Sequence, residues 1–390
     1  MDLKNKITTI MPRVHDLRWQ IHRYPELSLK EEQTAALVER ELIEIGLVPQ
    51  LVTNTGVTAL LEGGRPGKTI ALRADMDALP LPEETGCLHS SKVAGVMHAC
   101  GHDVHTAVLL GVARLLASFR ERISGNVKFI FQPAEENNPT GGAKPMIEAG
   151  VLNDPKVDLI LALHVWPELP VGSIGVRDGA MMAASDRVFV KVLGKSSHGS
   201  APHQGIDAIA VSAQVISALQ TVVSRNVSPL EAAVLTFGTV RGGHRYNIIA
   251  NQVELEGTCR TLNPAVRRLV ETRIDQVASQ VAVGLGAESE VRYVHGYPAL
   301  INSAEGFTVL KQAGEETLGK DGVVIPQYPA MGAEDFAFFV EKVPGALFWL
   351  GCTKLNAPMV PLHSPEFLPA EECLAVGVEV LSRAVFNYLT

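Results

Sequence analysis

The amino-acid sequence predicts an α/β fold, a mixed and mainly parallel sheet with helices on both faces, into which a smaller α+β domain is inserted. Up to residue 184 and again from residue 297, apolar runs that do not alternate in polarity lie between helical patterns, as is typical of buried parallel strands. Between 185 and 296 the strands alternate in polarity and follow the order β-α-β-β-α-β, the ferredoxin-like split pattern. We therefore predict a larger domain, 1–184 and 297–390, split by a smaller one at 185–296.

The elements of the larger domain follow from where its apolar runs begin and end. The first 45 residues carry apolar side chains at helical spacing, and Gly46 ends this pattern. Strands are predicted at 57–61, 69–73, 127–131, 157–163 and 346–350, and helices at 105–119 and 143–149. The Gly-rich segment 63–69 is too short for a phosphate-binding P-loop and leads into a strand, so we predict a tight hairpin turn there.

The strands and helices of the smaller domain are also predicted from its patterned segments. Its strands are predicted at 186–193, 232–241, 251–260 and 291–295, and its helices at 208–224 and 264–285. An edge strand of such a sheet can pair with a second chain. We therefore expect a homodimer, with a homotetramer as the alternative.

Composition excludes several classes of protein. The 390 residues are 46% hydrophobic and 19% charged with a net charge of −8, which excludes disorder and disfavours nucleic acid or an anionic membrane as a partner. No run of about 18 apolar residues and no secretory signal is visible. The five cysteines are scattered and odd in number, so we expect a reducing, cytoplasmic setting.

Polar side chains follow three predicted strands of the larger domain. Asp75 and Asp77 follow the strand at 69–73, Glu135 and Glu136 follow the strand at 127–131, and His164 follows the next strand. Because ligands of doubly wound sheets bind at the carboxyl ends of the strands, these side chains are expected to lie together. Adjacent carboxylates point in different directions, so one glutamate can bind a metal while the other accepts a proton from water.

Cysteine and histidine side chains complete this pattern. Cys100 and His102 precede the helix at 105–119 and suit zinc, although imidazole also binds manganese, cobalt or nickel. His105 follows one helical turn later and is expected to be a helix-start residue or a support of a ligand rather than a ligand itself. His363 lies on a Pro-bounded loop, and its residue type alone leaves open whether it is a ligand or a surface residue.

Four segments carry a family resemblance, in order along nearly the whole chain. They are LRADMDALP at 72–80, HACGHD at 98–103, FQPAEE at 131–136 and MGAEDF at 331–336. This set resembles the N-acyl-amino-acid amidohydrolases, which include hippurate hydrolases, auxin-conjugate hydrolases and N-acetyl-diaminopimelate deacetylases. The wider group is the dinuclear metallopeptidases related to aminoacylase and carboxypeptidase. The resemblance is specific for the family and not for the substrate.

The resemblance implies a zinc-peptidase-like larger domain that binds two divalent metal ions, zinc first and manganese, cobalt or nickel as alternatives. Cys100 would be the bridging ligand, and Glu135 would be the general base. The remaining implied ligands are His102, Glu136, His164 and His363. Related peptidases have His-x-Asp where this chain has Asp75-x-Asp77, so we place these two aspartates behind the ligands, as supports.

The resemblance also implies roles for the smaller domain, as a dimerisation (lid) domain. His198, in the segment 194–202, would reach the active site of the partner subunit and stabilise the oxyanion. Asn247 and Arg260 match substrate-contacting residues. A guanidinium suits the α-carboxylate of a substrate because its fork binds a carboxylate with two hydrogen bonds.

The predicted function is metal-dependent hydrolysis of the amide bond of small-molecule N-acyl-L-amino acids. Alternatives are a dipeptidase or carboxypeptidase, or an N-acetyl-diaminopimelate deacetylase in particular. A binding module that kept the fold and lost its metal is disfavoured, because the set of candidate ligands is intact. The acyl group, the amino acid and the metal are not specified by the sequence.

Overall fold

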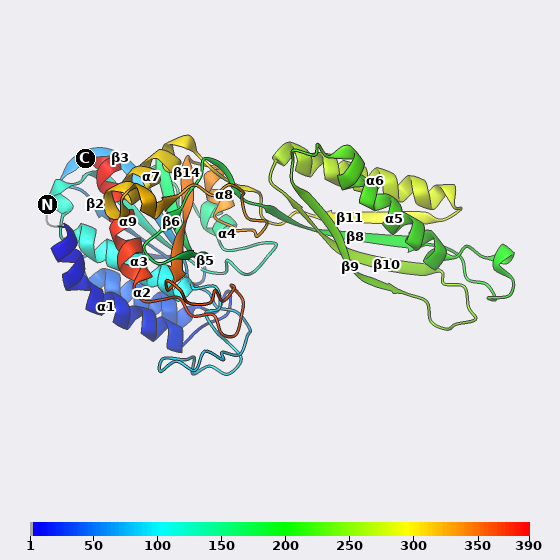
Figure 1. The fold of residues 1–390 in the computed structure, drawn as a ribbon, viewed down its shortest axis with the longest axis horizontal. Helices are drawn as coiled ribbons and strands as arrows, with labels where there is room; N and C mark the ends of the chain where they lie inside the picture. Colours follow the sequence, from blue (N-terminus) through cyan, green and yellow to red (C-terminus); the bar gives the residue numbers. More distant parts are fainter. Residues whose placement is uncertain (1–2) are drawn as a thin grey trace. The chain divides into compact units, whose positions relative to one another are not determined.

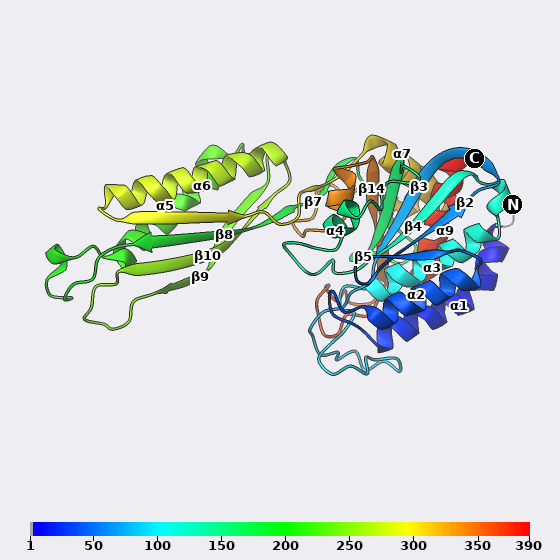
Figure 2. The same ribbon diagram turned by 180° about the vertical axis from the view of Figure 1, so that it is seen from behind.

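The computed structural model describes residues 3–390 and divides them into two compact units (Figures 1 and 2). The larger unit comprises the chain up to Met181, Ile301–Tyr328 and Asp335–Thr390. The smaller unit comprises Met182–Leu300 and Pro329–Glu334. Each unit has a hydrophobic core of its own.

The larger unit is built on an eight-stranded sheet with the strand order β1-β2-β4-β3-β5-β14-β6-β13. The central pairs β4–β3, β3–β5 and β5–β14 are parallel, whereas β1–β2, β2–β4 and β14–β6 are antiparallel. The strands are β1 (Pro49–Val52), β2 (Gly56–Glu62), β3 (Arg65–Asp75), β4 (Ser124–Gln132), β5 (Leu159–Pro170), β6 (Ile174–Gly175), β13 (Val323–Val324) and β14 (Gly345–Thr353). The predicted mixed, mainly parallel sheet is confirmed.

Helices cover both faces of this sheet. Helices α3 and α9 contact each other and β3, and α1 packs on both of them; Figure 2 shows α4 on the opposite face. The helices are α1 (Leu3–Arg23), α2 (Glu32–Glu44), α3 (His102–Ala117), α4 (Ala143–Glu148), α7 (Ala304–Leu318), α8 (Ala337–Val340) and α9 (Cys373–Leu389), with short 3₁₀ turns η1 (Arg120–Arg122) and η3 (Lys320–Gly322). The helical pattern of the first 45 residues forms two helices, because Pro25 cannot continue α1.

The prediction of a tight hairpin turn at 63–69, between β2 and β3, is wrong. Strands β2 and β3 do not pair with each other, because β4 lies between them, and the chain crosses the start of β4 instead. Glycine permits this close crossing: a Cβ at Gly63 would lie 2.4 Å from the carbonyl oxygen of Ile123, and one at Gly67 would lie 2.6 Å from that of Ser124.

The smaller unit is an antiparallel sheet, in the order β11-β8-β10-β9, whose inner face packs against helices α5 and α6 (Figure 1). Its elements follow the chain order β8-α5-β9-β10-α6-β11, as the sequence predicts. They are β8 (Ala184–Leu193), η2 (Pro202–Gln204), α5 (Ala208–Asn226), β9 (Ala233–Gly242), β10 (Gln252–Thr261), α6 (Pro264–Gly284) and β11 (Glu288–Val294). Strands β7 (Gly179–Met182) and β12 (Leu300–Asn302) pair separately.

Helix α5 is the one helix within residues 3–390 that is long and apolar enough to cross a membrane. Length and composition alone are weak support for such a span. The face of α5 that carries Val211, Val215 and Leu219 lies in the core of the smaller unit, which accounts for the apolar composition.

Candidate metal centre

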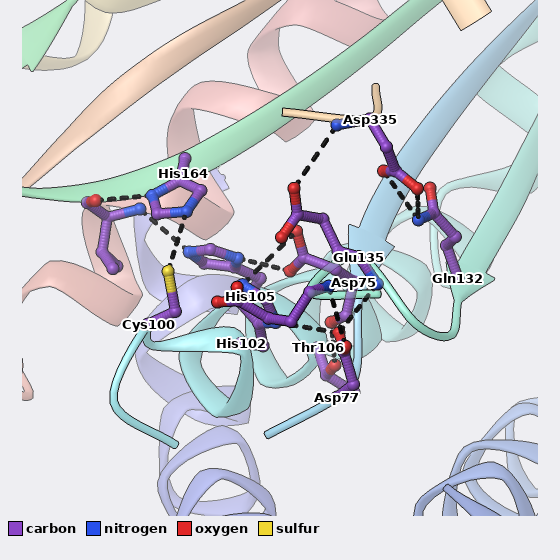
Figure 3. A network of polar contacts seen from close by, with 12 residues as sticks. Asp75, Asp77, Cys100, His102, His105, Thr106, Gln132, Glu135, His164 and Asp335 are labelled. Atoms are coloured by element: carbon purple, nitrogen blue, oxygen red, sulfur yellow. Dashed lines mark hydrogen bonds and ion pairs between the residues drawn. The ribbon is translucent and has the colours of Figure 1, made fainter. Parts of the chain in front are cut away.

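The polar residues predicted from the strand ends gather at the carboxyl ends of the central strands in the larger unit's sheet (Figure 3). Asp75 is the last residue of β3, and Glu135 follows β4 by three residues. His164 lies inside β5, which continues to Pro170 beyond the predicted end. Because β3, β4 and β5 are neighbours and parallel, their side chains converge with the first turn of α3.

The structure brings all predicted metal ligands of the larger unit together. Sγ of Cys100 lies 3.4 Å from Nε2 of His164, and Nε2 of His363 lies 3.1 Å from Oε1 of Glu136. Among the groups whose ligand atoms lie within 4.8 Å of one another are Cys100–His102–His164, Cys100–Glu136–His363, His102–Glu135–Glu136 and Asp75–His102–His105. Cys100 belongs to two of these groups, as a bridging ligand would.

Gly101 sets the approach of Cys100 and His102 to the site. Its φ of +81° places it in the left-handed region, immediately before α3 begins. A Cβ at this position would lie 2.4 Å from Cγ2 of Val165. Glycine is therefore required between the two candidate ligands by conformation and by space.

Asp77 orients both His102 and the loop that carries the two glutamates. Its Oδ1 lies 3.2 Å from Nδ1 of His102 and accepts from the backbone N–H of Glu135 (3.1 Å), while its Oδ2 accepts from that of Glu136 (3.0 Å). Ser28 donates to Oδ2 as well. A carboxylate on one ring nitrogen fixes the other toward a metal, and Nε2 of His102 is buried without a hydrogen bond.

Two further histidines differ in the atoms they leave available. Nδ1 of His164 hydrogen-bonds to the carbonyl oxygen of Val165 (2.7 Å), so its Nε2 faces Cys100. His105 contacts Asp75 through Nδ1 (2.6 Å) and accepts from the backbone N–H of Val165 at Nε2 (2.9 Å). Both nitrogens of His105 are thus engaged, and its place is beside the ligands.

The electrostatics of the cluster suit a divalent cation. Burial, and then the carboxylates of Glu136, Glu135 and Asp75, hold the pKa of the Cys100 thiol well above its ordinary value. Burial would lower the pKa of His102, but Asp75 and Asp77 raise it overall to about 10. A divalent cation would offset the negative charge of these buried carboxylates. It would also take the place of the protons on Cys100 and His102. The donor set, and an Nε2 of His102 that is buried without a hydrogen bond and 3.8 Å from Oδ2 of Asp75, therefore fit a metal.

Glu31 is a site residue that the sequence reasoning missed. Its Oε1 accepts from the backbone N–H of Ala134 (2.9 Å), and its Oε2 accepts from Thr55 (2.7 Å). Ala134 has a φ of +58°, in the left-handed region that alanine rarely adopts. Glu31 and Asp77 thus bind three successive backbone N–H groups, 134 to 136, and hold the loop at Glu135.

We expect Glu31→Ala to lower kcat by about 10- to 100-fold, because a displacement of about 1 Å at a catalytic group has effects of this size. KM for an amide substrate should change less, since Glu31 lies behind the loop. Steady-state kinetics and the metal content of the same preparation test this. Glu32→Ala, at an exposed position one residue later, is the control. Equal kcat in both variants would contradict the positioning role.

Arg73, Gln132 and Asp335 form a buried network behind the site (Figure 3 shows the latter two). The Arg73 guanidinium donates to Gln132 (2.8 Å), Asp75 (2.6 Å) and Asp335 (2.7 Å). The backbone N–H of Asp335 lies 3.4 Å from Oε1 of Glu135. The segment 331–336 signals the family, but nothing in it indicates these partners.

The predicted residues of the smaller unit lie in two places within that unit. His198 and Asn247 are on adjacent segments, since His198 bridges Ile248 and Gly199 donates to the carbonyl oxygen of Asn247 (2.9 Å). Arg260 pairs with Ser185 at the other end of β10, about 30 Å away at the rise of a strand. One copy of the smaller unit does not bring Arg260 to His198.

A mainly parallel sheet with a Cys/His/Glu cluster at the carboxyl ends of its strands is typical of the metal-dependent hydrolases. Within this class, the chain belongs to peptidase family M20/M25/M40, whose sequence model matches residues 71–387. It is an enzyme of the amidohydrolase and peptidase type that acts on amides. The resemblance to the amidohydrolases is confirmed.

Relatives of the chain are named for several different activities. N-acyl-L-amino acid amidohydrolase of Geobacillus stearothermophilus is 44% identical, over 78% of this chain and 82% of its own length. N-acetylcysteine deacetylase of Bacillus subtilis is 42% identical over 95% of both. Thermostable carboxypeptidase 1 of Saccharolobus solfataricus is 40% identical over 96% and 95%.

Solved structures share the fold over the whole chain. A protein from methicillin-resistant Staphylococcus aureus has a TM-score of 0.95 and 36% identity, covering 100% of this chain and 99% of its own. A Bacillus subtilis protein described as a dinuclear metal binding peptidase of the M20 family has a TM-score of 0.86 and 36% identity, covering 98% and 99%.

Proposed function

We propose that the protein hydrolyses the amide bond of N-acyl-L-amino acids to a carboxylic acid and a free amino acid. The observation that carries the proposal is the position of the Glu135 carboxylate, which is grouped with His102 and Glu136. It also lies beside the backbone N–H of Asp335. A proton acceptor is thus held against a set of metal ligands, the arrangement that metal-assisted hydrolysis needs.

We assign five ligands to two divalent cations: Cys100 between them, with His102, Glu136, His164 and His363. When bound, the cations polarise the scissile carbonyl and make water a better nucleophile. Zinc is our first choice, since thiolate and imidazole suit it, with manganese, cobalt or nickel as alternatives. We place Asp75 and Asp77 behind the ligands, because each lies against a histidine ring: Oδ1 of Asp77 is 3.2 Å from Nδ1 of His102, and Oδ1 of Asp75 is 2.6 Å from Nδ1 of His105.

Glu135 moves the proton in the proposed reaction. Its carboxylate accepts a proton from the attacking water and later donates it to the nitrogen of the leaving amine. The backbone N–H of Asp335 lies 3.4 Å from Oε1 of Glu135 and helps to hold this oxygen in place. Arg260 would bind the α-carboxylate of the substrate with two parallel hydrogen bonds.

We propose a homodimer, with a homotetramer as the alternative, in which His198 and Asn247 of one subunit complete the site of the other. The roughly 30 Å of β10 between these residues and Arg260 supports this arrangement. The edge strand β9 carries the exposed side chains of Val234 and Val240, which is a surface that a second copy could cover. The boundaries of the dimerisation (lid) domain at 185 and 296 stay a prediction.

We expect His198→Ala to lower kcat by about 10²- to 10³-fold, the usual cost of removing an oxyanion donor. Its side chain is exposed and hydrogen-bonded only locally to Ser200, so the thermal stability should not change. His203→Ala, at an exposed histidine in η2, is the matched control. An unchanged kcat in the His198 variant would refute the oxyanion role.

A substrate panel tests the proposed function. N-acetyl and N-benzoyl amino acids, dipeptides and N-acetyl-diaminopimelate are compared before and after chelation. We expect hydrolysis of the N-acyl amino acids, its loss on chelation and its return with added Zn²⁺, Mn²⁺, Co²⁺ or Ni²⁺. Faster cleavage of dipeptides or C-terminal residues would favour the second candidate, a dipeptidase or carboxypeptidase, which the relative named carboxypeptidase supports.

A reducing, cytoplasmic setting is part of the proposal. All five cysteines are free thiols, and four of them are buried. A bridging thiolate at Cys100 would be sensitive to oxidation, so the metal centre would be preserved best where thiols stay reduced.

A further inference from the structure

We propose that His22, Glu83 and Cys87 form a third cation site for a zinc-like transition metal, separate from the metal centre. His22 is near the end of α1, and Glu83 and Cys87 lie in the loop after β3. Their ligand atoms, Nε2, a carboxylate oxygen and Sγ, lie within 4.8 Å of one another. None of these residues belongs to the catalytic groups, and the inference does not depend on the proposed function.

The spacing of the three atoms approaches that of a tetrahedral site. Nε2 of His22 lies 3.3 Å from Oε1 of Glu83, which in turn lies 3.8 Å from Sγ of Cys87. Zinc bonds of about 2.0–2.3 Å at tetrahedral angles separate ligand atoms by about 3.3–3.6 Å. The Cys87 side chain is only half-buried, which leaves it room to rotate toward the other two ligands.

The histidine and the glutamate are already oriented for binding. Nδ1 of His22 lies 2.8 Å from Oδ2 of Asp103, and a carboxylate on one ring nitrogen is the usual support of a metal-binding histidine. Oε2 of Glu83 accepts from the backbone N–H of Ser91 (2.6 Å). The side chains of His22 and Glu83 are 0% and 3% exposed, so both polar ends are held in place in a site largely shielded from water.

Charge is conserved when a divalent cation enters. Both ring nitrogens of His22 face carboxylates, Nδ1 that of Asp103 at 2.8 Å and Nε2 that of Glu83 at 3.3 Å, an arrangement that favours the protonated imidazole. Binding releases the Nε2 proton of His22 and the thiol proton of Cys87. Protonated imidazole, carboxylate and thiol sum to zero, as do imidazole, carboxylate, thiolate and a divalent cation. The cation therefore adds no net charge to this region.

The Cys87 side of the site borders a cavity. Cys87 and the neighbouring His89 line a cavity of about 590 Å³, which offers room for a water molecule as the fourth ligand. Three protein ligands with one open position are common among zinc sites. Because the ligands come from α1 and from the loop, an ion here would join the loop to the helix.

Metal content and thiol reactivity test the site on the full-length protein. Wild type and Cys87→Ser are dialysed against Zn²⁺ and analysed by mass spectrometry of the metal, with Cys259→Ser, a buried thiol of the smaller unit, as control. We expect one ion fewer per chain in Cys87→Ser only, with kcat unchanged. A Glu83→Gln protein should bind the same ion at least tenfold more weakly. Equal zinc content in wild type and Cys87→Ser would overturn the proposal.

Alkylation gives a second readout. Cys87 is the one cysteine of the described chain that is not buried, so iodoacetamide on the folded protein reports mainly on this thiol. We expect Zn²⁺ to slow alkylation of Cys87, located by peptide mass spectrometry, at least tenfold. An unchanged rate at zinc concentrations that fill the catalytic centre would show a hydrogen-bonded Asp103–His22–Glu83 chain without a cation, and would overturn the site.

Discussion

A Glu135→Gln protein is expected to keep the metal content of the wild type and to hydrolyse N-acyl amino acids about 10²- to 10⁴-fold more slowly, the usual contribution of a general base. Glutamine retains an oxygen that can accept from the backbone N–H of Asp335, which lies 3.4 Å from Oε1 of Glu135. It cannot accept a proton from water. The loss should therefore appear in kcat, with little change in KM, in steady-state assays.

Two further variants serve as comparisons for Glu135→Gln. Glu136→Gln should lose metal affinity as well as activity, because Glu136 is a proposed ligand, so metal content separates the two glutamates. Glu148→Gln, on the exposed side of α4, should match the wild type. If Glu135→Gln retains kcat within about threefold, Glu135 is not the base, and another group must take the proton.

Apolar patterning predicts the buried parts of the fold because parallel strands with both faces covered are apolar throughout. Strand β14 shows the pattern best, since Gly345–Cys352 are all buried. The two-residue strands β6 and β13 are too short to produce any pattern. The crossing at Gly63 was predicted as a hairpin, because the same glycines fit a tight turn and the position of β4 depends on distant contacts.

The candidate site also has residues that the sequence could predict and residues that it could not. Residues at strand ends could be predicted, because parallel strands place their carboxyl ends, and so these side chains, next to one another. Glu31 and Asp335 could not, since their partners lie far along the chain: Ala134 is 103 residues from Glu31, and Arg73 is 262 residues from Asp335. These carboxylates bind backbone and guanidinium donors behind the site, and no local pattern marks such a contact.

Asp335 is held by donors on every side, which makes its replacement costly for stability. Its two carboxylate oxygens accept from the Arg73 guanidinium, from the Gln132 amide (2.8 Å to each oxygen) and from the backbone N–H groups of Gly142 (2.9 Å) and Ala143 (3.0 Å). Asp335 and Arg73 are fully buried. Removing one partner of a buried ion pair leaves the other charge without compensation, at a cost of about 3–5 kcal/mol.

We therefore expect Asp335→Ala to lower the free energy of unfolding by about 3–5 kcal/mol, measured by urea denaturation. Asp335→Asn should also be destabilised, because either orientation of the amide points its NH₂ group at donors. Glu305→Ala is the control: its pair with Lys68 (3.9 Å) is exposed and should contribute less than about 1 kcal/mol. Equal stability of Asp335→Ala and Glu305→Ala would contradict the network's role. Because Arg73 also binds Asp75, and the Asp335 N–H faces Glu135, kcat should fall in the Asp335 variants even where they remain folded.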